Sequence, residues 1–98
     1  MRVLFLCTRN SARSQMAEAL LVHEGLGRFE VASAGATPAM EVDPMTFEVL
    51  DELGVDWRAH RPKSYDAVQN VEWDIVLRAS RLRVNQLVVA TTTDSTTD

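Results

Sequence analysis

The first third of the chain passes from an apolar run through a polar turn into a segment with helical periodicity. Residues 3–6 are apolar and include β-branched and aromatic side chains, which is typical of a strand buried on both faces of a parallel sheet. From Ser14 onward the period changes to that of a helix. The apolar positions then share one helical face, made of Met16, Ala17, Leu20 and Leu21. Glu18 and Glu24 are expected outside that face, and the glycines that follow predict the end of the helix.

Two more strands are predicted further along the chain. Residues 29–32 form the first of them and lead into a turn at 33–35. A loop at 60–64 and a weaker helical stretch at 65–69 precede the last strand, at 74–77.

A second helix is predicted between these strands. Asp43 followed by Pro44 is a strong helix start, because an aspartate caps the first turn and proline fits its first position. The apolar stripe of this helix is formed by Phe47, Leu50 and Leu53. Gly54 is expected to end it.

Strands therefore alternate with helices, an order that predicts an α/β domain with a parallel sheet. We expect a three-layer α/β fold in which a short parallel sheet, in flavodoxin-like strand order, is flanked by helices. Residues 1–77 are assigned to this domain and residues 78–98 to a divergent tail, so the C-terminal part is expected to be truncated or divergent. In the tail, valine and threonine predict a last strand at 84–92, followed by a disordered end.

Composition and charge narrow the functional classes. The 98 residues carry a formal net charge of -4, which provides no general basic surface for nucleic acid. The apolar runs are too short to cross a bilayer, which takes about 20 residues. The single cysteine, Cys7, can form no disulfide within the chain, which fits a reducing compartment. We therefore expect a cytoplasmic protein that binds neither nucleic acid nor membranes.

Cys7 and Arg13 frame the turn between the first strand and the first helix. Ligands of parallel sheets bind beyond the carboxyl ends of the strands, where turn amides and the positive end of a helix can hold an oxyanion. The same field favours a thiolate over a thiol, and arginine offers a planar fork for two oxygens of a phosphate-like ligand. The turn thus combines a nucleophile, backbone amides that can bind an oxyanion and an arginine that can bind its charge. The alternatives are a buried structural thiol and a surface arginine.

The segment LFLCTRNSARSQMAEALL, at 4–21, resembles the low-molecular-weight protein tyrosine phosphatase superfamily, most closely its arsenate reductase branch. Gln15 stands where the phosphatase branch tends to have proline. The resemblance extends over residues 2–77. Three further motifs are similar to that branch, namely SAG at 33–35, DPMTFEVLDELGVD at 43–56 and HRPKS at 60–64.

The resemblance implies a role for each residue of the turn. Cys7 would be the nucleophile that attacks phosphorus or arsenic. Arg13 would hold the oxyanion and stabilise the transition state. The oxyanion-binding loop between them would consist of Thr8, Arg9, Asn10, Ser11 and Ala12.

Supporting residues are implied in the same way. Asn10 would keep the loop in its strained shape, bonded to Ser33 and supported by His60. Ser14 would donate a hydrogen bond to the Cys7 thiolate. No metal or other cofactor is implied.

Two parts of the family pattern have no counterpart in the sequence. The family protonates the leaving group with a late aspartate, usually in an Asp-Pro pair, and nothing after Leu77 supplies that loop, so the general acid is unknown. Ser80 stands where thioredoxin-linked arsenate reductases have a second cysteine. Reduction would then need an external thiol, such as a small thiol or a glutaredoxin-like protein. A frameshift or truncation of a longer gene would explain the tail.

Three functions follow as hypotheses. The leading one is arsenate reductase-like thiolate chemistry on a tetrahedral oxyanion, with Cys7 as nucleophile and a redox protein as possible partner. The first alternative is hydrolysis of phosphomonoesters through a phosphocysteine, as in low-molecular-weight tyrosine phosphatases. The second is an oxyanion-binding remnant without turnover. Whether the chain is an enzyme depends on which of the three holds.

Overall fold

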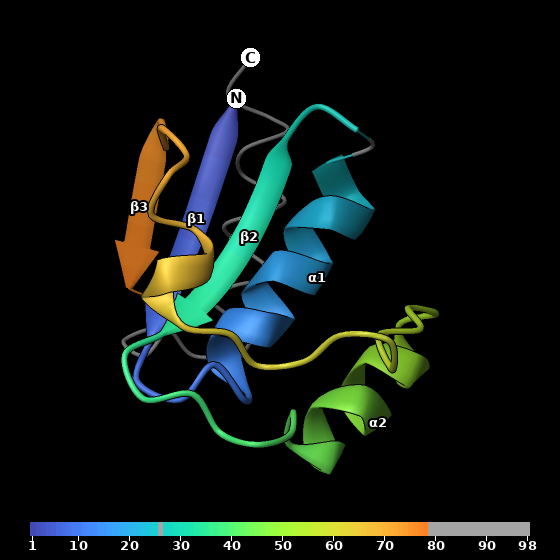
Figure 1. Cartoon of the computed structure of the whole chain (residues 1–98). Coiled ribbons are helices and arrows are strands. Elements are labelled where there is room, and N and C mark those ends of the chain that lie inside the picture. Colours follow the sequence, from blue (N-terminus) through green and yellow to red (C-terminus); the bar gives the residue numbers. More distant parts are fainter. Residues whose placement is uncertain (26, 79–98) are drawn as a thin grey trace.

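A computed structural model describes residues 1–25 and 27–78 of the chain. Three strands, two α-helices and one short 3-10 helix follow one another in these residues (Figure 1). In chain order they are β1 (Arg2–Cys7), α1 (Arg13–Gly25), β2 (Glu30–Gly35), α2 (Pro44–Glu52), η1 (Tyr65–Ala67) and β3 (Ile75–Arg78). The tail predicted for residues 78–98, with its strand at 84–92 and disordered end, lies outside the described residues except for Arg78, which ends β3.

The three strands form one parallel sheet in the order β2-β1-β3 (Figure 1). On one side, β1 pairs with β2 in a register that sets Cys7 opposite Gly35. On the other side, β1 pairs with β3, with Val3 opposite Ile75. The first strand in the chain therefore lies in the middle of the sheet. This arrangement confirms the predicted α/β fold with flavodoxin-like strand order.

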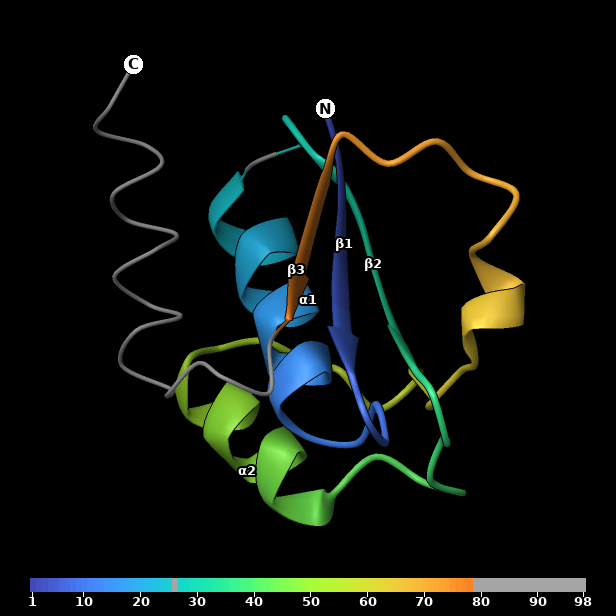
Figure 2. The same cartoon turned by 90° about the vertical axis from the view of Figure 1, so that its left-hand side faces the viewer.

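The side chains of β1 alternate between two cores, as the period of a strand requires. Val3 and Phe5 face α1 and α2, and together with residues of both helices they form the larger core. Leu4 faces the opposite side, where it packs with Ala34 and Val68. Figure 2 shows the sheet edge-on, with α1 and α2 on one side and η1 on the other. The sheet is thus the middle of three layers, as predicted.

The structure corrects two predictions about β2 and α1. Residues 33–35, predicted as a turn, are the last residues of β2, because their pairing with β1 continues to Gly35. Glu18, predicted outside the apolar face of α1, is buried. Its carboxylate accepts a hydrogen bond from the Ser33 hydroxyl and lies 3.7 Å from the Lys63 ammonium, and these partners make the burial tolerable.

The second helix begins as its sequence predicts. The Asp43 side chain accepts a hydrogen bond from the Met45 amide, and proline occupies the first turn. The helix ends at Glu52, so Leu53, predicted within the apolar stripe, is the exposed C-cap residue. Gly54 then adopts φ +78°, a left-handed conformation that suits glycine.

No helix in the described part of the chain is long and apolar enough to cross a membrane.

An exposed ion pair joins α2 to the segment that follows it. Arg58 donates to both carboxylate oxygens of Asp51, and its guanidinium also lies near the ring of Phe47. These hydrogen bonds, followed by the attraction between the two charges, lower the pKa of Asp51. Because the pKa is lower in the folded state, the pair stabilises the fold at neutral pH. That contribution is lost as the pH falls through the folded-state value.

We therefore expect Arg58→Gln to raise the pKa of Asp51 toward its ordinary value, because the bidentate donor is removed. The titration of the Asp51 carboxyl can be followed by carbon NMR. The matched control is Arg2→Gln, which removes the exposed ion pair between Arg2 and Glu30. Unfolding should also be easier than in the wild type at neutral pH, and this difference should vanish in acid. If Asp51 has the same pKa in the wild type and in Arg58→Gln, then Arg58 does not lower the pKa of Asp51.

Candidate functional site

Cys7 is the last residue of β1, and α1 begins at Arg13. The five residues between them form a loop at the carboxyl edge of the sheet, at the lower end of β1 in Figure 1. This is the edge at which parallel α/β sheets bind their ligands. The Cys7 side chain is partly buried there.

The carbonyl groups of this loop are held from outside. Each carbonyl oxygen from Cys7 to Ala12 accepts a hydrogen bond of 2.7–3.3 Å. The donors are, in order, the amides of Ala36, Thr37 and Ala39, the side chain of Gln15, and the amides of Asp43 and Met16. In a trans peptide the N–H points away from the preceding C=O. The amides of Arg9, Asn10, Ser11 and Ala12 are therefore turned to the inner side of the loop.

One of these inward amides reaches the sulfur. The Asn10 amide donates to Cys7 Sγ at 3.0 Å, so the inner side of the loop faces the sulfur at this residue. Within residues 1–25 and 27–78, the amides of Arg9, Ser11 and Ala12 donate to no protein acceptor. A ring of amide donors next to a cysteine is the arrangement that an oxyanion requires. We call residues 7–13 the cradle.

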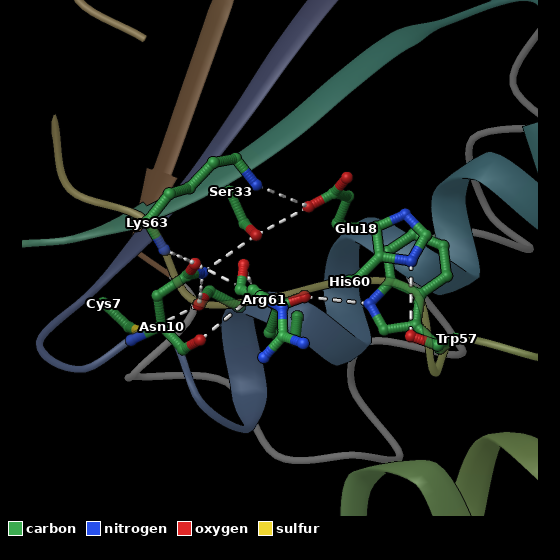
Figure 3. Close-up of polar contacts among 10 residues, drawn as sticks. Cys7, Asn10, Glu18, Ser33, Trp57, His60, Arg61 and Lys63 are labelled. Carbon is green, nitrogen blue, oxygen red and sulfur yellow. Dashed lines mark hydrogen bonds and ion pairs between the residues drawn. The ribbon is translucent and has the colours of Figure 1, made fainter. Parts of the chain in front are cut away.

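Asn10 gives the cradle its shape. Its φ of +53° lies in the left-handed region, which asparagine tolerates better than most residues. Its wholly buried side chain makes four hydrogen bonds (Figure 3). Nδ2 donates to the hydroxyls of Ser14 and Ser33, each at 2.8 Å, and Oδ1 accepts from Gln15 Nε2 and the Lys63 amide, each at 2.9 Å. The amide thus uses both donors and both lone pairs.

The Asn10 side chain donates to both serines of this network. Ser33 donates its own proton to the Glu18 carboxylate at 2.6 Å, so it accepts from Asn10. Ser14 likewise accepts from Asn10, and its oxygen lies 2.7 Å from Cys7 Sγ in a contact in which either atom can be the donor. The sulfur therefore contacts the Ser14 hydroxyl and accepts a hydrogen bond from the Asn10 amide.

Gly35 allows the cradle to lie against β2. A β-carbon built on this residue would be 2.8 Å from the Thr8 carbonyl oxygen and 2.9 Å from the Asn10 amide nitrogen. Both neighbours are backbone atoms, which cannot move without moving the loop. The turn motif at 33–35 thus has a steric reason for its glycine.

The structure brings some of the predicted site residues together. Cys7, Asn10, Ser14 and Ser33 form one hydrogen-bonded group, and the roles that the resemblance gives them stay predictions. Thr8, Arg9, Ser11 and Ala12 form the backbone of the cradle. Arg13 is exposed at the first position of α1, and its role as an oxyanion ligand stays a prediction.

Among the described residues, His60 makes no hydrogen bond with Asn10, and its supporting role stays a prediction. Its ring stacks on Trp57, with ring centroids 3.4 Å apart and planes 2° from parallel, and its Nδ1 lies 3.3 Å from the Trp57 carbonyl oxygen. The amide of Lys63 supplies the contact to Asn10 instead. His60 borders a surface cavity of about 230 Å³ whose other lining residues are Glu41, Val42, Pro44, Phe47, Arg58 and Arg61, none of them in the cradle.

Sequence reasoning missed three contributors to the site, namely Gln15, Glu18 and Lys63. Gln15 and Glu18 lie on the first two turns of α1, three residues apart, and both are buried. Polar side chains inside an otherwise apolar stretch were the available signal. Among the described residues, no cluster of histidine, cysteine, aspartate and glutamate side chains could hold a metal ion.

Comparisons with known proteins agree on a family. The model of the family described as low molecular weight phosphotyrosine protein phosphatase matches residues 2–96. The glutaredoxin arsenate reductase of Synechocystis sp. is 31% identical over 84 residues, which cover 86% of this chain and 63% of that protein. The protein-arginine-phosphatase of Geobacillus stearothermophilus is 39% identical over 74 residues, which cover 74% of this chain and 49% of that protein.

Solved structures give the same picture. The low molecular weight protein tyrosine phosphatase from T. tengcongensis is 35% identical, with a TM-score of 0.68 over 80% of this chain and 57% of that one. The thioredoxin-dependent arsenate reductase of Corynebacterium glutamicum is 27% identical, with a TM-score of 0.77 over 98% of this chain and 60% of that one. The chain therefore spans between 49% and 63% of the length of these four relatives.

Gly35→Ala is expected to weaken phosphate binding at least about tenfold, a loss of about 1.4 kcal/mol, because the new methyl group displaces the cradle. Titration calorimetry with inorganic phosphate measures this effect. Gly54→Ala is the matched control, since its β-carbon meets open space and only the backbone is strained. The control should lose roughly 1–2 kcal/mol of stability and keep its phosphate affinity. Equal affinities in the two variants would contradict the steric role of Gly35.

Proposed function

Because the chain belongs to the low molecular weight phosphotyrosine protein phosphatase family, we propose that Cys7 performs thiolate chemistry on a tetrahedral oxyanion, with arsenate reduction as the reaction. The observation that carries this proposal is the surroundings of Cys7 Sγ. The Asn10 amide donates to the sulfur, the Ser14 hydroxyl oxygen lies 2.7 Å from it, and the neighbouring loop amides have no protein acceptor among the described residues. The arsenate reductases among the relatives support arsenate as the oxyanion.

In the first step, the Cys7 thiolate attacks arsenic and a hydroxide leaves, protonated to water, so that a bond joins sulfur to As(V). The cradle amides and Arg13 hold the oxyanion charge during this step. An external thiol then attacks the Cys7 sulfur. The sulfur–arsenic bond breaks, its electron pair stays on arsenic, and arsenite leaves as As(III). A second external thiol resolves the mixed disulfide and restores Cys7.

An external thiol is part of the proposal because the sequence contains one cysteine. A small thiol or a glutaredoxin-like protein would supply the two electrons, in a cytoplasmic, reducing setting. The names of two relatives, a glutaredoxin arsenate reductase and a thioredoxin-dependent arsenate reductase, support a thiol reductant.

Hydrolysis of phosphomonoesters through a phosphocysteine is the second candidate, favoured by the relatives named as tyrosine and arginine phosphatases. Its weak point is the general acid that would protonate the leaving group. Asp43, from the Asp-Pro pair, caps α2 through the Met45 amide. A protein that binds oxyanions without turnover is the third candidate, and it needs the cradle alone.

Purified protein separates these candidates in three assays. With arsenate and an external thiol or glutaredoxin, the proposal predicts arsenite formation and matching thiol consumption. Cys7→Ser should lower this rate by at least about 1000-fold while retaining much of the phosphate affinity, because the cradle amides remain. Met45→Leu, an exposed change on α2, is the control that should behave as the wild type.

The other outcomes identify the other candidates. Turnover of p-nitrophenyl phosphate without arsenate-dependent thiol consumption would favour the phosphatase. Saturable phosphate binding with neither activity would favour the binding protein. A Cys7→Ser variant with wild-type turnover would refute the catalytic assignment altogether.

A further inference from the structure

Gln15 is a wholly buried polar side chain that the thiolate chemistry itself does not use. It lies in the first turn of α1, directly after Ser14, and makes four hydrogen bonds. Its Oε1 accepts from the indole Nε1 of Trp57 at 2.8 Å. Its Nε2 donates to Asn10 Oδ1 at 2.9 Å and to the carbonyl oxygens of Asn10 and Arg61, each at 3.2 Å. The side chain thus connects the cradle to residues 57–61.

Trp57 fixes the orientation of the Gln15 amide. An indole N–H can only donate, so the oxygen of Gln15 must face Trp57 and its nitrogen must face Asn10. Trp57 is itself held in place, since it is buried in the larger core and its ring stacks on His60. The orientation of the Gln15 amide is therefore determined by Trp57, which lies outside the cradle.

Gln15 in turn holds the residue at which the cradle turns. It binds both the backbone carbonyl and the side-chain oxygen of Asn10, whose φ is +53°. The amide of the same residue points at Cys7 Sγ. A shift of Gln15 would therefore change the direction of the amides that face the sulfur and its ligand.

We propose that Gln15 is a positioning residue for the oxyanion cradle, and that Trp57 acts on the cradle through it. This inference rests on the proposed function, because it concerns the affinity of the same cradle for an oxyanion. Trp57 is then the link by which oxyanion binding reaches residues 57–61. The second tryptophan is a natural reference, because Trp73 Nε1 donates to the Val68 carbonyl oxygen on the opposite face of the sheet.

The first test uses the unmodified protein. The indole N–H signals of Trp57 and Trp73 are followed by ¹H–¹⁵N NMR while inorganic phosphate is added. The Trp57 signal is expected to shift in step with phosphate binding, because its acceptor contacts Asn10, while the Trp73 signal stays in place. If other signals of the spectrum shift as phosphate binds and the Trp57 signal does not, the inference is overturned. This measurement needs no variant to fold.

The second test uses three variants and phosphate affinity as the readout. Gln15→Met keeps the length of the side chain and removes all four hydrogen bonds, so phosphate should bind about tenfold or more weakly. Trp57→Phe removes the indole donor, keeps an aromatic ring beside His60, and should weaken binding in the same direction but less. Trp73→Phe is the matched control and should bind as the wild type does.

The double variant separates positioning from packing. If Trp57 acts through Gln15, the combined Gln15→Met and Trp57→Phe changes should weaken binding no more than Gln15→Met alone. Additive losses would overturn the coupling, and wild-type affinity in Gln15→Met would overturn the positioning role. A different result would refute the proposed function, namely a wild-type protein that binds no phosphate and does not reduce arsenate.

Discussion

The buried amide of Asn10 is the group on which the geometry of the cradle depends. Its backbone makes the left-handed turn, and its side chain bonds two serine hydroxyls, the Gln15 amide and the Lys63 backbone. A reversed amide would set its own N–H groups against two other donors. Such a conflict between buried donors is costly, so the arrangement has one stable orientation.

The cradle is a local loop that is held by distant parts of the chain. The segment after β2 binds its carbonyl oxygens from outside, and Gly35 permits the close approach. Residues 57–63 approach from the far side through Gln15 and Lys63. The fold itself therefore holds the loop in this shape. Such preorganisation is what makes amide donors effective toward a charged transition state.

The sequence predicts the elements and the location of the site because both follow from local patterns. Strand and helix periods, the Asp43 cap and the turn at Cys7 can be recognised over a few residues each. The failures concern side chains whose placement depends on tertiary contacts. Glu18 has the helical position of a surface residue, and only the folded chain shows that Ser33 and Lys63 compensate its burial. The supporting role of His60 rests on resemblance alone and stays a prediction, and in the structure its ring stacks on Trp57.

The rate at which iodoacetate labels Cys7, measured with and without inorganic phosphate, tests the central claim most directly. The claim is that the cradle holds the Cys7 sulfur and an oxyanion at the same place. It predicts that phosphate protects Cys7 from labelling in a saturable manner. Labelling that proceeds at the same rate with and without phosphate would contradict the claim.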